Sequence, residues 1–375
     1  LAASANLSSK GVGGAGAAAV SVLQNTMAAR IEKSAIEAHT LNNIASSDAL
    51  LINTAGGMAV GGGYFNGAGS VSVQYTSDTT KAELEDPDVQ AQHTAVQAKT
   101  KNVDVNVAGQ VSAGQNGAGL AVAFNHMNNA TQAHILGSSI KGAAHEVAVA
   151  AENSGTTVSA AAGVSGGSTS ALTGALAINQ GKDTTQAGIG ASESKRSSLE
   201  NVNRIAVDAK DSTTKVAVAG GLSAAGTAAV GGAIAYNQVG GVGYQSTEAF
   251  LNNTDILTKG DKSALRVRAL DEATLGTAAA GIGGAGSVAV QGAAATSNIE
   301  KNVRTQMKDT TVKSAAGEKR GSLSLKAESL GSMYTNTVVL AGSGTAAVGA
   351  GVSVTTALGS TRAELSGGRQ EVGGA

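Results

Sequence analysis

The chain has 375 residues with a net charge of −1, and 52 of them are glycine while one is proline. It contains no cysteine, which excludes disulfide scaffolds, thiolate metal sites and thiol catalysis. The balanced charge argues against nucleic acid as a partner, because a nucleic-acid interface needs basic residues to neutralise phosphates. Apolar residues make up 42% of the chain and charged residues 14%, so we expect an ordered fold.

A degenerate repeat starts seven times along the chain, and one copy runs Gly-Thr-Ala-Ala-Val-Gly-Gly-Ala-Ile-Ala-Tyr-Asn from Gly226 to Asn237. A recurrent period of this kind predicts a stacked architecture in which each unit contacts its neighbours. We therefore expect residues 1–375 to form a single β-solenoid shaft of seven repeats, the last of them partial. Because the chain opens inside a repeat, we expect a fragment of a longer chain. The repeats start at Gly14, Gly67, Gly114, Ser168, Gly226, Gly286 and Gly344.

Each repeat divides into three pieces of roughly twenty residues. The first is rich in Gly and Ala, the second ends in Thr-x-Ala-x-Leu/Ile, and the third ends in apolar-x-apolar-x-Ala. The last two pieces alternate with period two, as strands with one buried face do. The second piece ends at 80–84, 131–135, 185–189, 247–251 and 361–365, and the third at 147–151, 205–209, 265–269 and 323–327.

These patterns predict an all-β fold, a parallel β-helix (β-solenoid) with about three coils in each repeat. Coils of about 20 residues, each adding about 4.8 Å, would give 18 or 19 coils and a rod of roughly 90 Å. The inward positions of the third piece, such as Val207, Val267 and Leu325, should stack as one apolar column.

The repeats resemble those of leukotoxin-like filamentous adhesins, the large secreted β-helical exoproteins of Gram-negative bacteria that include fusobacterial leukotoxin and haemagglutinin-type passengers. The similar segments are Ala-Gly-Gly-Leu-Ser at 219–223, Gly-Gly-Ala-Ile-Ala-Tyr-Asn at 231–237, Ser-Thr-Glu-Ala-Phe-Leu at 246–251 and Leu-Arg-Val-Arg-Ala at 265–269. The resemblance implies a right-handed β-helix that is secreted or held on the bacterial cell surface. It also implies an outer-membrane translocator as a partner, of the autotransporter or two-partner kind.

The expected function is therefore that of a structural and adhesive rod, which attaches to a glycan or protein of a host cell or other surface. Two alternatives stay open at this point, namely the β-helical part of a secreted leukotoxin-like toxin and a polysaccharide-active β-helix enzyme. We expect no enzymatic activity and assign no catalytic residue, because the aromatics that would stack a sugar ring are almost missing.

No metal or cofactor site is expected either. The glycines of 281–286 are not followed by the Lys-Ser/Thr of a phosphate loop. The carboxylates of 83–88 have no calcium-loop spacing, and the five histidines fall at different phases of the repeat.

Two surface features could make contacts. Charged loops precede the third piece in three consecutive repeats, and we expect stacking to align them along one edge, about three coils apart, as a weakly basic ridge. The ridge residues are Lys195, Arg196, Lys259, Lys262, Lys319 and Arg320. The second feature is a wall of Gly and Ala, as at 278–286 and 341–351. Its side chains are small either because the interior is tightly packed or because smooth outer surfaces associate with one another.

Overall fold

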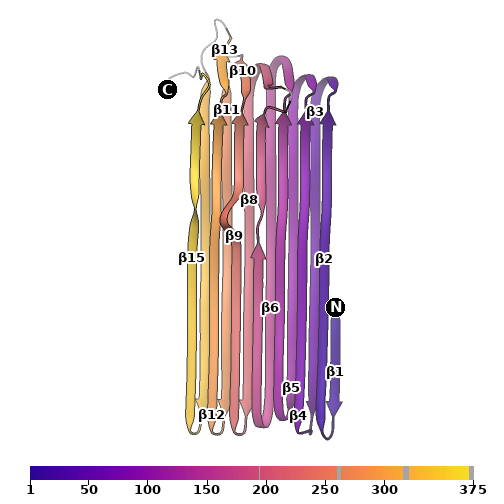
Figure 1. Ribbon diagram of the computed structural model, residues 1–375, viewed down its shortest axis with the longest axis vertical. Coiled ribbons are helices and arrows are strands. Elements are labelled where there is room, and N and C mark those ends of the chain that lie inside the picture. Colours follow the sequence, from indigo (N-terminus) through magenta and orange to yellow (C-terminus); the bar gives the residue numbers. More distant parts are fainter. Residues whose placement is uncertain (194, 260–262, 316–320, 371–375) are drawn as a thin grey trace.

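The computed structural model describes residues 1–193, 195–259, 263–315 and 321–370. These residues form one sheet of 15 β-strands, and the strand pairings among them are parallel (Figure 1). The prediction of an all-β parallel solenoid is confirmed. The strands are β1 (Ala2–Ser8), β2 (Val12–Glu32), β3 (Ala35–Gly61), β4 (Phe65–Glu85), β5 (Asp88–Leu136), β6 (Ser139–Gly181), β7 (Thr184–Gly190), β8 (Ser197–Ala225), β9 (Ala228–Asn252), β10 (Thr254–Thr258), β11 (Ala264–Ala285), β12 (Val288–Lys308), β13 (Thr311–Ser314), β14 (Ser322–Ser343) and β15 (Ala346–Ser366).

The prediction of three coils in each repeat is wrong, because one repeat makes one coil. Partners in neighbouring strands lie between 51 residues apart, as Gly67 and Ala118 do, and 62 residues apart, as Thr185 and Thr247 do. Seven coils at about 4.8 Å each give a stack about 30 Å thick, while a 21-residue wall strand is about 70 Å long. The predicted rod of 90 Å along the stacking axis is therefore wrong as well. The long axis of the molecule follows the strands (Figure 1).

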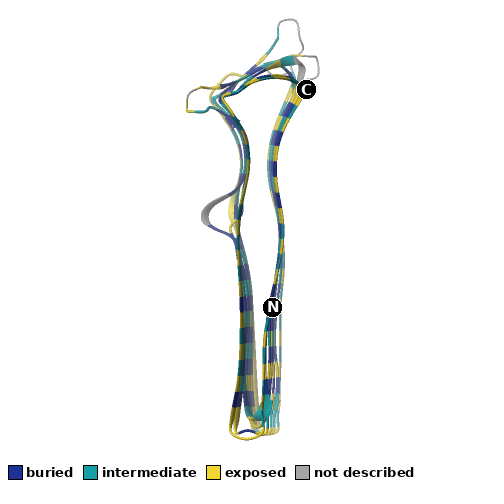
Figure 2. Ribbon diagram, turned by 90° about the vertical axis from the view of Figure 1, so that its right-hand side faces the viewer, coloured by how far each residue is buried: buried dark blue, intermediate teal, exposed yellow. Residues whose placement is uncertain are grey.

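Each coil consists of an ascending wall, a short head and a descending wall, which a tight base turn joins to the next ascending wall (Figure 2). The two walls lie close together at the base and separate towards the head (Figure 2). β2, β4, β9, β12 and β15 belong to the ascending wall, and β8, β11 and β14 form most of their coils' descending wall. The head contains β10 and β13 together with the first residues of β3, β5, β6 and β8.

The error in coil length came from polar residues that lie inside the molecule. Asn237 resembles a corner residue in the sequence, but it is fully buried in the middle of β9. Its side chain donates to the carbonyl oxygen of Gly276 at 2.7 Å in the facing descending wall. Likewise, the third piece and the Gly/Ala piece after it are one continuous strand, as in β8.

The corner between the ascending wall and the head is built by a left-handed residue in most coils. Lys33, Asp86, Gly137, Asn253 and Asp309 have φ between 47° and 58°. Each donates its backbone N–H to a carbonyl oxygen of the next coil at 2.9 Å. Asn, Asp and Gly tolerate this conformation best, so the sequence supplies the tight corner locally.

The interior has three levels. Near the head lies an aliphatic cluster that includes Leu84, Ile135, Val207 and Val267, whereas the base holds a cluster made almost wholly of alanine. Between them lies a polar band, in which Asn179 donates to Asn237 Oδ1 at 2.9 Å between adjacent coils. The predicted inner column is confirmed, because Val267 pairs in register with Val207 and with Leu325.

Near the base, the two walls approach so closely that inward positions have no room for a side chain. A Cβ atom on Gly281 would lie 2.6 Å from the carbonyl oxygen of Gly292 in the facing wall, and one on Gly221 would lie 2.9 Å from that of Gly232. By contrast, Gly232 and Gly292 face outward, and a Cβ atom there would have nothing within 4 Å. Tight packing therefore explains the inward glycines of the Gly/Ala wall but not the outward ones.

Candidate functional site

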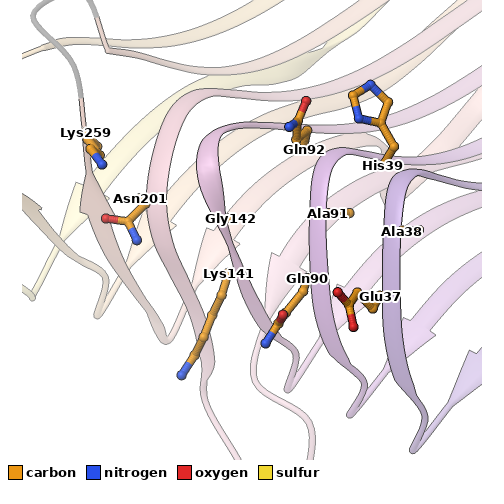
Figure 3. A pocket seen from close by; sticks show the side chains of 10 residues that line it. All are labelled: Glu37, Ala38, His39, Gln90, Ala91, Gln92, Lys141, Gly142, Asn201 and Lys259. Atoms are coloured by element: carbon orange, nitrogen blue, oxygen red, sulfur yellow. The ribbon is translucent and has the colours of Figure 1, made fainter.

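An open polar feature of the surface lies on the head. Head residues alternate inward and outward, so that Val89 and Ile140 are buried while Gln90 and Lys141 point outward. Glu37 pairs in register with Gln90, and Gln90 with Lys141. The parallel stack thus places an acidic, an amide and a basic side chain side by side on successive coils (Figure 3).

Around this row lies a shallow concavity of about 800 Å³, which we call the head groove (Figure 3). It crosses five coils, from Glu37 in the first to Lys259 in the fifth, which spans about 19 Å at about 4.8 Å for each coil step. Amide side chains of Gln90, Gln92 and Asn201 supply donors and acceptors along it. The lining residues are Glu37, Ala38, His39, Gln90, Ala91, Gln92, Lys141, Gly142, Asn201 and Lys259.

The head groove carries charges of opposite sign at its two ends. Glu37 and Lys259 are exposed, and among the described residues neither forms an ion pair. Lys141, between them, has its Nζ 3.6 Å from Glu200 Oε1. The groove can therefore accept a polar, elongated ligand, with an anionic group favoured towards Lys141 and Lys259.

Of the residues of the predicted basic ridge, the structure describes Lys195, Arg196 and Lys259, and these three do not lie along one edge. Lys195 and Arg196 lie before the head strand of their coil, at the corner with the ascending wall, whereas Lys259 follows β10 at the opposite corner of the head. The loops also belong to successive coils, not to positions three coils apart. The physical reason is local: five other coils make this corner with one left-handed residue, whereas in the coil of Lys195 none of the described residues at the corner, 191–193 and 195–196, has a positive φ. Lys262, Lys319 and Arg320 lie outside the described residues.

The described cations of the first ridge loop, Lys195 and Arg196, form ion pairs with carboxylates of other coils. The Arg196 guanidinium donates to both carboxylate oxygens of Asp255, at 3.2 and 3.3 Å, and to the carbonyl oxygen of Asp309 at 2.7 Å. The ammonium of Lys195 lies 3.6 Å from Asp88 Oδ1. These contacts connect four coils, the second, fourth, fifth and sixth, so the Arg196 guanidinium is held at the corner and does not offer a free charge. Of the described ridge residues, Lys259 alone lines the head groove.

A second cluster of charges, which we call the luminal charge band, lies inside the solenoid between the walls. Lys301 Nζ lies 3.3 Å from Asp211 Oδ1 and also contacts Asp271. Lys215 Nζ has no hydrogen-bond partner among the described residues, although it is fully buried. Five carboxylates and two ammonium groups lie in this part of the interior, and each of these side chains is nearly inaccessible to solvent. The band comprises Asp78, Asp104, Asp183, Asp211, Asp271, Lys215 and Lys301.

Burial shifts the titration of several groups in this band. Burial, reinforced by the carboxylate of Asp211, raises the pKa of Asp183 and Asp271 from 3.8 to about 6. Burial likewise lowers the pKa of Lys215, and the carboxylate of Asp183 offsets part of this effect. Burial disfavours the charge of Lys301, but Asp211 and Asp271 outweigh it and raise its pKa.

Among the described residues, no group of three or more His, Cys, Asp or Glu side chains is placed to hold a metal ion. Within the luminal charge band, Lys301 forms an internal ion-pair network with Asp211 and Asp271. Such networks cost desolvation, and they favour one register over others because a shifted strand would leave a buried charge unpaired.

Neither the head groove nor the luminal charge band was predicted from the sequence. A signal for the band does exist in the sequence. Leu265, Val267 and Ala269 point inward at every second position, and continuing this alternation to Asp271 would have placed its carboxylate inside. The groove has no such signal, because its lining comes from five coils and depends on the coil length.

The chain matches no protein-family model, no curated protein and no solved structure. The resemblance to leukotoxin-like adhesins therefore stays a prediction from the repeat residues. Within the described part of the chain, no helix has the length and apolar character needed to cross a membrane.

Proposed function

We propose that this chain is a structural and adhesive segment of a bacterial protein that is secreted or displayed on the cell surface. The observation that carries the proposal is the head groove, an open polar surface that successive coils of a rigid parallel stack hold in register. Side chains on such a scaffold keep their spacing without a ligand, which lowers the entropy lost on binding.

The partner that best suits this groove is a surface glycan that carries an anionic group. Glu37, Gln90, Gln92 and Asn201 offer hydrogen-bonding groups for hydroxyls, and Lys141 with Lys259 offers positive charge for a carboxylate or sulfate. Individual contacts on an exposed surface are weak. Attachment by many copies on one cell would raise the overall avidity.

The test is binding of the purified chain to immobilised acidic glycans, to matched neutral glycans and to host cells. We expect retention on acidic glycans, with at least about a tenfold loss for the Lys141→Glu/Lys259→Glu double variant. Lys10→Glu is the control, because Lys10 is exposed at the opposite, base end of the molecule. Failure of the parent chain to bind any of these surfaces, or an equal loss in the control, would contradict the proposal.

A further inference from the structure

The half of each coil next to the base turn is almost free of charge, on the outside as well as inside. Six stretches of the sequence contain no Lys, Arg, Asp or Glu, and each runs down the base half of a descending wall, round the base turn and up the next ascending wall. Lys10, in the turn before β2, lies outside them. The stretches are 49–77, 105–140, 153–181, 216–247, 273–299 and 329–361. The charges of the chain therefore gather in the upper walls and the head.

The base half also reverses the usual polarity of a sheet, because its larger apolar side chains point outward. Ser72 and Gln74 of β4 are fully buried between the walls, whereas the alternate residues Val71 and Val73 point outward. A sheet with one face in water normally has polar residues on that face. This exterior therefore suits apolar surroundings. Three of its outward side chains are more than half exposed, namely Leu120 at 52%, Leu172 at 54% and Ile234 at 52%.

We call this outward surface the apolar base zone. Its strands are paired along both edges, so further coils would leave it uncovered. Its outward residues are Gly, Ala, Val, Leu, Ile, Phe and Tyr. The zone consists of the outward residues of 65–75, 118–124, 172–178, 230–236 and 288–294 on the ascending wall and of 105–113, 158–166, 216–224 and 276–284 on the descending wall.

The zone has two faces and the height of the hydrocarbon layer of a membrane. A segment such as 216–224 is about 30 Å long, at about 3.3 Å for each residue. The hydrocarbon core of a bilayer is also about 30 Å thick. The two faces look in opposite directions, because the interior lies between the walls (Figure 2). A protein partner on one wall would leave the other wall in water, whereas acyl chains would surround both.

The backbone of the zone is satisfied from coil to coil, as a hydrocarbon environment requires. Strands in the zone are hydrogen-bonded on both sides, and the base turns continue these bonds. The backbone N–H of Gln115 donates to the carbonyl oxygen of Gly63 at 3.2 Å. Likewise, the N–H of Thr227 donates to Thr169 at 3.0 Å, and that of Ser287 donates to Thr227 at 3.1 Å. Burying these turns in lipid would therefore leave those N–H groups paired.

Tyrosine and polar residues mark the two limits of the zone. At the upper limit, the Tyr236 hydroxyl donates to Gln238 Oε1 at 3.0 Å and accepts from Asn298 Nδ2 at 3.2 Å. Glu300 is the first outward charge on the same wall above Asn298. At the base, Tyr64 is exposed in the turn before β4. Tyrosine is enriched at membrane interfaces, where its ring lies in apolar surroundings and its hydroxyl in water.

We propose that the apolar base zone inserts into the hydrocarbon layer of a lipid bilayer, base first, and leaves the head in water. The occupant of both outer faces is the acyl chains of the lipid, because the zone is uncharged, apolar on two opposite sides and as tall as the layer. The outward glycines of the Gly/Ala wall then lie against lipid. The proposal does not depend on the head groove, which lies at the other end of the molecule.

The experiment is flotation of the purified chain with phosphatidylcholine vesicles through a density gradient. Neutral lipid and high salt suppress attraction between charges. The parent should float with the vesicles. Gly232→Lys on the ascending wall and Gly220→Lys on the descending wall should each lower the partition coefficient at least about tenfold, because both place an ammonium group at mid-height on a lipid-facing strand. A Cβ atom at either glycine has nothing within 4 Å, so both variants should fold, which circular dichroism checks.

Gln186→Lys is the matched control, since it adds the same charge above the zone on the ascending wall, beside Glu248. It should float like the parent. The chain has no cysteine, so Ile234→Cys and Lys210→Cys each provide one site for a polarity-sensitive dye. Vesicles should shift the emission of the dye to the blue at residue 234 in the zone but not at residue 210 above it.

A parent that stays at the bottom of the gradient would overturn the proposal. So would equal flotation of the parent and both glycine variants, since it would indicate binding outside the zone. Light scattering without lipid tests the other occupant, a second copy of the chain. Assembly that Gly232→Lys abolishes, together with no flotation of the parent, would show that the walls contact each other and would also overturn insertion.

Discussion

Replacing Lys301 by methionine tests whether the luminal charge band stabilises the fold. Lys301 is 4% exposed and is the ammonium group that contacts both Asp211 and Asp271. Removing one partner of a buried ion pair leaves uncompensated charge and commonly costs about 3–5 kcal/mol. We therefore expect Lys301→Met to lower the free energy of unfolding by an amount in this range at pH 7.5.

The loss should depend on pH, because a buried carboxylate can bind a proton instead of staying charged. The pKa of Asp271 is about 6 when Lys301 is present. Protonating Asp271 at pH 7.5 therefore costs about 2 kcal/mol, from about 1.36 kcal/mol for each pH unit. At pH 5, Asp271 is already mostly protonated and this cost disappears. The destabilisation by Lys301→Met should thus be about 2 kcal/mol smaller at pH 5 than at pH 7.5.

Urea unfolding followed by circular dichroism at the two pH values measures both quantities. Lys308→Met is the matched control, because Lys308 lies on the same strand but is exposed at its end. Adding Asp271→Asn to Lys301→Met should recover part of the loss at pH 7.5. An equal loss at pH 5 and pH 7.5, or a loss no larger than that of Lys308→Met, would refute the electrostatic reasoning.

Three further predictions concern packing and titration. Val267→Asp should cost several kcal/mol in thermal or urea unfolding, because the carboxylate would be buried without a partner in the inner column; unchanged stability would contradict the observed strand phase. Gly281→Ala should destabilise the fold by about 1–3 kcal/mol, because the new Cβ atom would meet the carbonyl oxygen of Gly292 in the facing wall. Gly292→Ala should be neutral or should stabilise by up to about 1 kcal/mol, because its Cβ atom would point outward into open space. A larger loss of stability for Gly292→Ala than for Gly281→Ala would contradict the facing of the two walls. Unfolding midpoints should show opposite pH effects for Asp183 and His134. Because the pKa of Asp183 is raised to about 6, its contribution to stability is full below about pH 4 and is lost as the pH rises through about 6. Because burial lowers the pKa of His134 to about 4, its contribution is present above about pH 6.5 and is lost as the pH falls towards 4. Asp183→Asn should flatten the first effect and His134→Gln the second.

The sequence by itself determined the fold class and the inward face of most strands. Alternation in segments such as 265–269 requires one buried face, and the near absence of proline with repeated polar and glycine positions is typical of stacked strands. The same reasoning placed Val207, Val267 and Leu325 in one column, as the register shows. These features depend on near neighbours along the chain, which is why period-two patterns reveal them.

The tertiary structure alone decided the coil length, the shape and the site. A buried Asn in the middle of a wall and an exposed Asn at a corner have the same sequence signature, so Asn237 could not show that one repeat makes a single tall coil. The ridge was misplaced for a related reason: Lys195 and Lys259 precede similar segments but lie at opposite corners of the head. The head groove arises from side chains that are more than 200 residues apart at its two ends, from Glu37 to Lys259. Their proximity depends on the number of residues that each coil contains, and only the paired strands measure that number.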